Sequence, residues 1–151
     1  MLTAERTSVW RGRYQMTDDG RPVAVWDPSF WRHGGDFEVE GRRYEVRADN
    51  WGTRYRMVDE TGGEVALIER AGRKHWTVKA GARTYEFRRA SFWGDRQELV
   101  ADGQAVGTIR RKSSWSGTIE ADLPGMPLPI RVCVVGVQIA IWQAASAAAA
   151  S

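Results

Sequence analysis

The chain has 151 residues, enough for one domain with a sizeable core and too few for two ordinary domains. Its 42% hydrophobic and 27% charged residues exclude a disordered or fibrous chain, and its single cysteine and two histidines exclude a disulfide framework and a Cys/His zinc site. The formal net charge of +3, from 22 basic and 19 acidic residues, is too mild to indicate nucleic-acid binding. We therefore expect no cofactor, no metal and no nucleic-acid partner.

A pattern of about 41 residues recurs along the chain. Trp10, Trp51 and Trp93 lie 41 and 42 residues apart, and each is followed by an alternating stretch, an acidic residue, a glycine turn and a Val-Ala or Val-Gly strand. The second half of the unit recurs at residues 37–47 and 76–89. Each unit is expected to contain about four strands, which gives eleven or twelve in total.

The pattern within each unit favours short antiparallel strands. Tyr14 and Met16, or Tyr85 and Phe87, alternate with polar neighbours at a period of two residues. Between the strands lie residues that close hairpins: Asp19-Gly20, Glu40-Gly41, Gly62-Gly63, Gly81 and Asp102-Gly103. The chain is therefore predicted to form an antiparallel meander.

The strand pattern ends at residues 123–129 (LPGMPLP), where three prolines exclude pairing inside a sheet. A helix is predicted from about residue 129 to 145, and it is apolar on nearly all sides, so it must be surrounded. Residues 1–143 are expected to form the domain and residues 144–151 an Ala/Ser-rich tail that extends the helix and then frays.

Three surroundings are open to this helix: a bilayer, a partner protein, or the preceding strands. Its strongly hydrophobic part is shorter than the roughly 20 residues of a membrane span. About twelve strands closed on themselves leave a lumen that one helix fills. We therefore expect an all-β fold with one helix, a closed antiparallel barrel wrapped around the C-terminal helix. A tail-anchored protein is the alternative, and a propeller is rejected because fewer than the four required blades are present.

The segments YRMVDETGGEVALI and ELVADGQAVGTIRR, followed by ADLPGMPLPIRVCVVGVQIAIW, resemble the tubby C-terminal-like superfamily. Within that superfamily the chain resembles the bacterial branch, the LURP-one-related proteins, which are grouped with phospholipid scramblases. The resemblance covers Trp10 to Trp142. It implies a twelve-stranded barrel around the terminal helix and a non-enzymatic role, since tubby domains bind phosphoinositide head groups. The acidic calcium loop and the cysteine-rich lipidation segment of scramblases are not visible in the sequence, so scrambling is not implied.

Basic residues gather between residues 70 and 96, where eight bases face two acids, so the remaining 124 residues sum to −3. His75, Lys79 and Arg88 are predicted to point outward, and Arg70, Arg73 and Arg83 to lie in turns. Arg110 and Arg111 belong to a second basic run, beside Trp115. The candidate anion-binding residues are Arg70, Arg73, Lys74, Lys79, Arg83, Arg88, Arg110 and Arg111. The alternative is a solvated strand face that discourages edge pairing.

The remaining tryptophans and the polar residues of the helix are assigned mainly to packing. Trp10, Trp51 and Trp93 share one repeat position, which favours a common packing role, and Trp26, Trp76 and Trp142 are expected in the core. One residue each of Phe30-Trp31 and Phe92-Trp93 is expected outside the regular sheet face. Arg131 is expected to pair near the barrel mouth with a carboxylate or strand carbonyls, and Cys133 to be an inert core thiol.

No nucleophile elbow or phosphate loop accompanies His33 or His75, so no enzyme is expected. The predicted function is a binding module that docks peripherally on anionic phospholipid, or on a phosphoinositide-like or other phosphorylated ligand. The alternative is a protein-interaction scaffold without lipid affinity, which would contact a protein partner through Trp31 or Trp115. Residues 1–10 lack the features of a signal peptide, so we expect a cytoplasmic protein, peripheral to the membrane when bound. We also expect a monomer.

Overall fold

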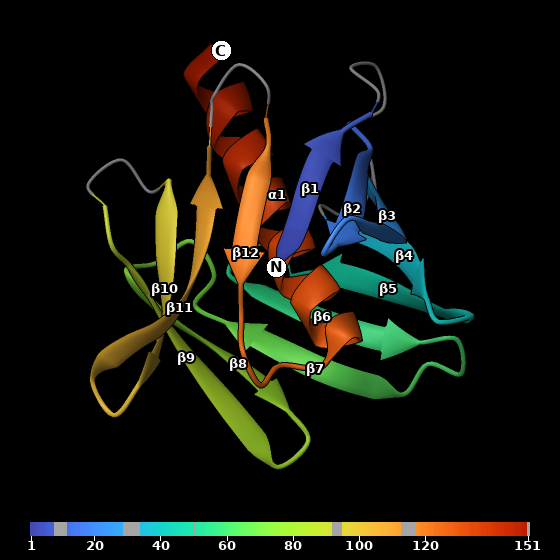
Figure 1. The fold of residues 1–151 in the computed structure, drawn as a ribbon, viewed down its shortest axis with the longest axis horizontal. Helices are drawn as coiled ribbons and strands as arrows, with labels where there is room; N and C mark the ends of the chain where they lie inside the picture. The colour runs from blue at the N-terminus through green and yellow to red at the C-terminus, as the bar shows by residue number, and fades with distance from the viewer. Residues whose placement is uncertain (8–11, 29–33, 50, 92–94, 113–116, 151) are drawn as a thin grey trace.

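The computed structural model describes residues 1–7, 12–28, 34–49, 51–91, 95–112 and 117–150. Within these ranges the chain forms twelve β-strands, closed into a barrel, and one α-helix, α1 (Figure 1). The strands are β1 (Leu2–Arg6), β2 (Tyr14–Asp18), β3 (Arg21–Pro28), β4 (Gly35–Val39), β5 (Arg42–Ala48), β6 (Arg54–Asp59), β7 (Glu64–Glu69), β8 (His75–Ala80), β9 (Arg83–Arg89), β10 (Arg96–Ala101), β11 (Gln104–Arg111) and β12 (Ile119–Asp122). The predicted fold class is confirmed.

Antiparallel closure depends on the first strand. Every strand pairs antiparallel with the next along the chain, and β1 pairs with β12 through Leu2 opposite Ala121 and Ala4 opposite Ile119. The repeats that begin at Trp10 supply only β2 to β12. In a meander, an odd number of strands would leave the first and last strand parallel, so β1 is the strand that allows an antiparallel seam.

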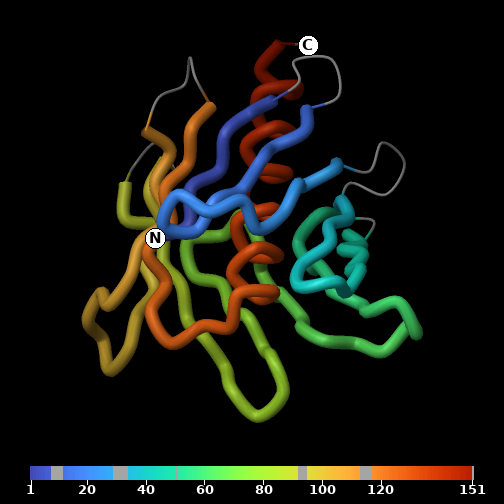
Figure 2. The backbone as a smooth tube through the Cα atoms, turned by 45° about the vertical axis from the view of Figure 1, so that its right-hand side comes forward, coloured from blue at the N-terminus to red at the C-terminus, as the bar shows by residue number. Residues whose placement is uncertain are grey.

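The two ends of the barrel differ in how they connect the strands. At one end, the turn end, tight hairpins such as Asp19-Gly20 and Asp102-Gly103 use two consecutive residues with positive φ, between 50° and 84°. The opposite end, the loop end, carries the connections that follow β1, β3, β5, β7, β9 and β11. In Figure 2 the hairpins β8–β9 and β10–β11 lie at the bottom, and the C-terminus lies at the top.

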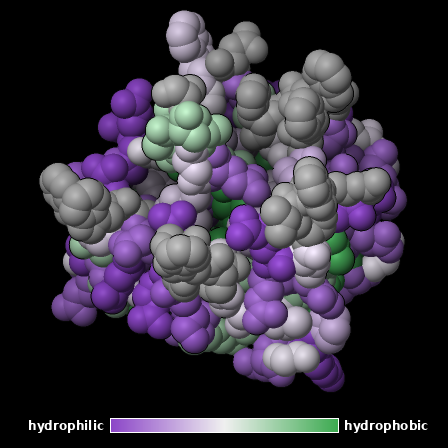
Figure 3. Space-filling view, turned by 90° about the horizontal axis from the view of Figure 1, so that it is seen from above, coloured by the Kyte–Doolittle hydropathy of each residue, from purple (hydrophilic) through white to green (hydrophobic). Residues whose placement is uncertain are grey.

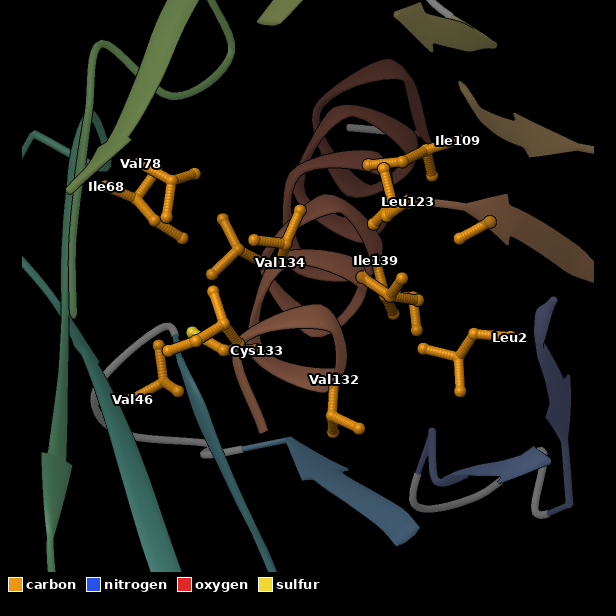
Figure 4. Close-up of a cluster of buried hydrophobic side chains, with 14 of the residues drawn as sticks. Leu2, Val46, Ile68, Val78, Ile109, Leu123, Val132, Cys133, Val134 and Ile139 are labelled. Atoms are coloured by element: carbon orange, nitrogen blue, oxygen red, sulfur yellow. The ribbon is translucent and has the colours of Figure 1, made fainter. Parts of the chain in front are cut away.

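The helix α1 (Leu128–Ala150) enters the barrel at the turn end and passes through its interior. Figure 4 shows Val134 lying toward Ile68 and Val78, whereas Ile139 lies on the opposite side of the helix, the side of Leu2 and Leu123. Nine of the ten residues from Ile130 to Ile139 are buried, and Arg131 is half-buried. The predicted burial of the helix inside the sheet is confirmed.

The helix is longer than the predicted range of about 129–145, because it continues to Ala150. Alanine has the highest intrinsic helix propensity, which accounts for the continuation of α1 through residues that are exposed from 144 onward. By length and composition alone α1 would also cross a bilayer, with a mean hydropathy of 1.7 over 18 residues, but half of that window is buried inside the barrel.

The polar residues of α1 behave as the sequence predicts. The Arg131 guanidinium donates to the Met126 carbonyl at 3.0 Å and to both oxygens of the Asp18 carboxylate at 3.4 and 3.5 Å, close to where the helix enters the barrel. Cys133 is buried, and desolvation raises the pKa of its thiol to about 12, so the thiolate does not form near neutral pH.

A glycine sets the distance between α1 and the barrel wall. A Cβ atom on Gly136 would lie only 2.3 Å from the indole of Trp26, which is itself completely buried on β3 and tilted against Phe37 at 6.1 Å. Because these rings are held from several sides, the indole has little room to retreat. Gly136 therefore allows the helix to lie directly against β3.

We predict that Gly136→Ala destabilises the fold by about 2 kcal/mol or more, because overpacking of a rigid core outweighs the helix propensity gained by replacing glycine. Urea unfolding of both proteins measures the change. The double variant Gly136→Ala/Trp26→Phe should recover part of the loss, because the smaller ring yields space. An unchanged or more stable Gly136→Ala protein would contradict the close packing of α1 on β3.

Candidate functional site

The structure separates the eight candidate basic residues into two groups. Arg70, Arg73, Lys74, Arg88, Arg110 and Arg111 lie on the loop-end turns or on the strand ends beside them. Lys79 lies farther along β8 and pairs with Glu69 at 2.9 Å. Arg83 is the first residue of β9, at the turn end, where it donates to the Gly125 carbonyl at 3.2 Å. The prediction that Arg83 lies in a turn is wrong, and neither Lys79 nor Arg83 joins the loop-end group.

The structure also corrects the interpretation of Trp51. Its side chain is 87% exposed, so it has no packing role in the core. Trp10 and Trp93, which share its repeat position, lie outside the described residues. Trp26, Trp76 and Trp142 are buried, which confirms the other part of the prediction.

Trp51 is carried by a hydrogen-bonded turn between β5 and β6. The Asp49 carboxylate accepts hydrogen bonds from the backbone amides of Thr53 at 3.0 Å and Arg54 at 3.3 Å, and the Asp49 carbonyl accepts one from Gly52 at 3.2 Å. Burial opposes ionisation of Asp49, but backbone amides that donate to the carboxylate hold its pKa below the ordinary value. The turn is therefore held by a charged acceptor at neutral pH.

The Trp51 turn is joined to the neighbouring turn between β7 and β8. The amide of Ala71 donates to the Thr53 carbonyl at 2.8 Å. The two turns border a hollow of about 500 Å³ lined by Asp49, Thr53, Arg54, Glu69, Arg70 and Arg73. Arg54 pairs with Glu69 at 3.4 Å, whereas Arg70 and Arg73 are exposed and form no ion pair with another described residue.

Basic side chains continue along the loop end toward β12. The Lys74 carbonyl accepts a hydrogen bond from the Arg89 amide, which joins the β7–β8 turn to the end of β9. Beyond it lies a second hollow of about 350 Å³, lined by Ser91, Asp95, Arg96, Arg110, Arg111 and Lys112. Lys112 and Arg110 both pair with Glu120, at 2.9 and 3.5 Å.

We call this series of side chains the basic rim. It consists of Arg54, Arg70, Arg73, Lys74, Arg88, Arg89, Arg96, Arg110, Arg111 and Lys112. The acids beside it are Asp49, Glu69, Asp95, Glu98 and Glu120, so ten bases face five acids and the rim carries +5, more than the +3 of the whole chain. Seen from above, side chains at the periphery of the described surface are mostly hydrophilic (Figure 3).

The helix α1 leaves the barrel through the same end. Ile141 lies beside Gly72 of the β7–β8 turn, and the guanidinium of Arg111 lies over the Trp142 ring, 5.1 Å from its centroid. Residues 144–150 continue beyond these contacts and are exposed. The rim and the end of α1 therefore share one end of the molecule.

A hollow larger than either of the two hollows of the rim lies elsewhere and has the opposite charge. It measures about 650 Å³ and lies over β4, β5 and the β6–β7 turn, with four acids and two arginines in its lining. One of the acids, Asp36, has a raised pKa, chiefly because it is partly buried. An acidic hollow disfavours phosphates, so it is not the site that the sequence predicts.

Several predicted features lie outside the described residues: Phe30, Trp31, His33, Phe92, Trp93 and Trp115. His75 is described, and it is exposed at the start of β8, as predicted. No cluster of three or more potential metal ligands occurs within the described ranges.

Sequence reasoning missed Arg54 and the exposure of Trp51. The signal for Trp51 was its context, Asp-Asn-Trp-Gly, because an Asx residue and a glycine that flank a tryptophan favour a turn over a strand. Gly52 indeed has a φ of +69°. Arg54 had no comparable signal, because its place in the rim depends on which turns are neighbours.

Comparisons with known proteins leave the chain without an assigned family: no family model, curated protein or solved structure matches it.

We predict that Asp49→Ala loosens the Trp51 turn and speeds hydrogen exchange of the Thr53 and Arg54 amides about fivefold, because they lose a charged acceptor. The pKa of Asp49 is lower in the folded than in the unfolded protein. The stability that its carboxylate contributes is therefore fully present above the ordinary carboxyl pKa of about 3.9, and it is lost as the pH falls through the pKa of the folded state.

The matched control is Asp59→Ala in the β6–β7 turn, where the carboxylate accepts hydrogen bonds from the Thr61 and Gly63 amides. It should speed exchange at those two amides and leave the Trp51 turn unchanged. If the Thr53 and Arg54 amides exchange at the same rate in Asp49→Ala as in the unmodified protein, Asp49 does not hold the Trp51 turn.

Proposed function

We propose that this protein is a non-enzymatic binding module that docks peripherally on anionic phospholipid membranes through the basic rim. The observation that carries the proposal is an excess of unneutralised positive charge. Five cations of the rim form no ion pair with another described residue: Arg70, Arg73, Lys74, Arg89 and Arg111. An anionic surface attracts each cation held within a Debye length of it.

The shape of the rim favours a surface over an enclosed small ligand. Sites for small molecules are concave and largely apolar, with few polar groups. The two hollows of the rim are lined mainly by charged and polar side chains, and they lie on successive turns rather than in one cavity. Guanidinium groups present paired donors that fit phosphate oxygens, so several lipid head groups can be bound side by side.

The resemblance to the tubby superfamily supports the same class of ligand, because tubby domains bind phosphoinositide head groups. A cytoplasmic location, expected from the sequence, also suits the proposal, since the cytoplasmic leaflet is the one rich in anionic lipid. The protein-interaction scaffold is the outcome left open if no lipid is bound.

We predict that the full chain co-sediments with vesicles containing phosphatidylserine and not with vesicles of phosphatidylcholine alone. Arg70→Gln/Arg73→Gln should weaken binding about 30-fold, since each base near an anionic surface contributes about 1 kcal/mol. The charge-matched control is Arg21→Gln/Arg42→Gln at the turn end, where both arginines are exposed and form no ion pair with a described residue. This control should bind within about twofold of the unmodified protein.

Raising the salt concentration should weaken vesicle binding of the unmodified protein more than that of Arg70→Gln/Arg73→Gln, because fewer charges remain to be screened. Equal losses in the two double variants would contradict a role for the rim while leaving lipid binding intact. Absence of binding to phosphatidylserine vesicles at low salt would overturn the proposed function.

A further inference from the structure

Trp51 is the most exposed large hydrophobic side chain among the described residues. It is 87% exposed, against 45% to 52% for Met1, Val25 and Val106. An indole carries a large apolar surface and one N–H donor, which suits it to the boundary between a hydrocarbon phase and water. Because it is so exposed, the indole can contact such a boundary without any rearrangement of the core.

The exposure is imposed by a defined turn. Asp49, which precedes Trp51 in the turn, accepts hydrogen bonds from the amides of Gly52, Thr53 and Arg54, which follow it. Gly52 has a φ of +69°, a conformation that glycine adopts without strain. Because the turn holds the indole outward before any contact is made, less backbone entropy is lost when the indole binds.

The position of the turn places the indole beside unneutralised cations. The hydrogen bond from the Ala71 amide to the Thr53 carbonyl joins the Trp51 turn to the turn that carries Arg70 and Arg73. The exposed aromatic residue and the two exposed guanidinium groups thus lie on two neighbouring turns that are joined by a hydrogen bond. An interfacial aromatic residue and cations beside it supply the two contributions to peripheral membrane binding, buried apolar area and electrostatic attraction to anionic lipid.

We propose that Trp51 inserts its indole into the interfacial layer of an anionic phospholipid bilayer while Arg70 and Arg73 contact the lipid phosphates, so that the barrel docks with its loop end toward the membrane. This inference rests on the proposed function and adds the anchor and the orientation. Residues 144–150 of α1, which emerge at the same end and carry no charge, then face the bilayer, whereas the tight hairpins of the turn end face the solvent.

The first test compares Trp51→Ala with Val106→Ala on phosphatidylserine vesicles. Val106 is an exposed apolar residue on β11 near the β10–β11 hairpin, at the turn end. Trp51→Ala should weaken vesicle binding about tenfold, because the apolar contact with the bilayer is lost. Val106→Ala should bind within about twofold of the unmodified protein. Both variants should keep the unmodified protein's thermal midpoint, because neither side chain is buried.

The second test measures how deeply positions 51 and 106 enter the bilayer. Trp51→Cys and Val106→Cys are each labelled with an environment-sensitive fluorophore, and Cys133 stays unlabelled because it is completely enclosed by the core. On vesicles of phosphatidylserine and phosphatidylcholine, the label at position 51 should shift to shorter wavelength and be quenched by brominated acyl chains. The label at position 106 should stay in water.

The outcomes separate this inference from the function on which it rests. If the unmodified protein binds phosphatidylserine vesicles but Trp51→Ala binds equally well, or the label at position 51 stays in water, the anchor is overturned and rim-mediated binding survives. A shift at position 106 instead of position 51 would reverse the orientation and overturn the inference. If the unmodified protein binds no vesicles, the function and the inference fail together, and a protein partner for Trp51 becomes the remaining hypothesis.

Discussion

The burial of α1 inside the closed sheet is the interaction on which the rest of the structure depends. Twelve strands enclose more space than their own inward side chains fill, so the barrel requires an apolar occupant. The helix in turn is apolar on nearly all sides and requires an enclosure. The helix fills the interior of the barrel, and the barrel buries the apolar surface of the helix. The close approach of Gly136 to Trp26 shows how tightly the two pack. The seam between β1 and β12 completes this enclosure.

Filling the barrel also decides where function can reside. Barrels of similar type with an empty lumen carry ligands inside, but here the space is occupied by the side chains of α1. Binding is therefore left to the outer wall and the two ends. The turn end is built from tight hairpins, and α1 enters there with Arg131 held by Asp18. The loop end has the longer connections, where binding residues usually accumulate on a rigid scaffold.

The sequence predicts most of this fold because its signals are local. Alternation of Tyr85 and Phe87 with polar neighbours, the Asp-Gly hairpins and the proline-rich segment before the helix each depend on a few consecutive residues. The candidate site is predicted less well because its members meet through pairing register and barrel closure. Lys79 appears as a free cation in the sequence, yet Glu69 on the adjacent strand neutralises it. The predicted packing role of Trp51 is wrong because it rests on the repeat position, whereas the turn residues around Trp51 govern its exposure.

The net charge of the chain does not show how unevenly its charges are distributed. The chain has a net charge of +3, a value that by itself argues for no particular partner, but the rim alone carries +5. The difference arises because acids gather elsewhere, as in the hollow over β4 and β5. A molecule with one basic end and a more acidic remainder has a preferred orientation toward an anionic surface, because the near end is attracted and the far side is repelled. Electrostatics alone would then orient the barrel before Trp51 makes contact, and the apolar contact would add residence time that salt does not screen.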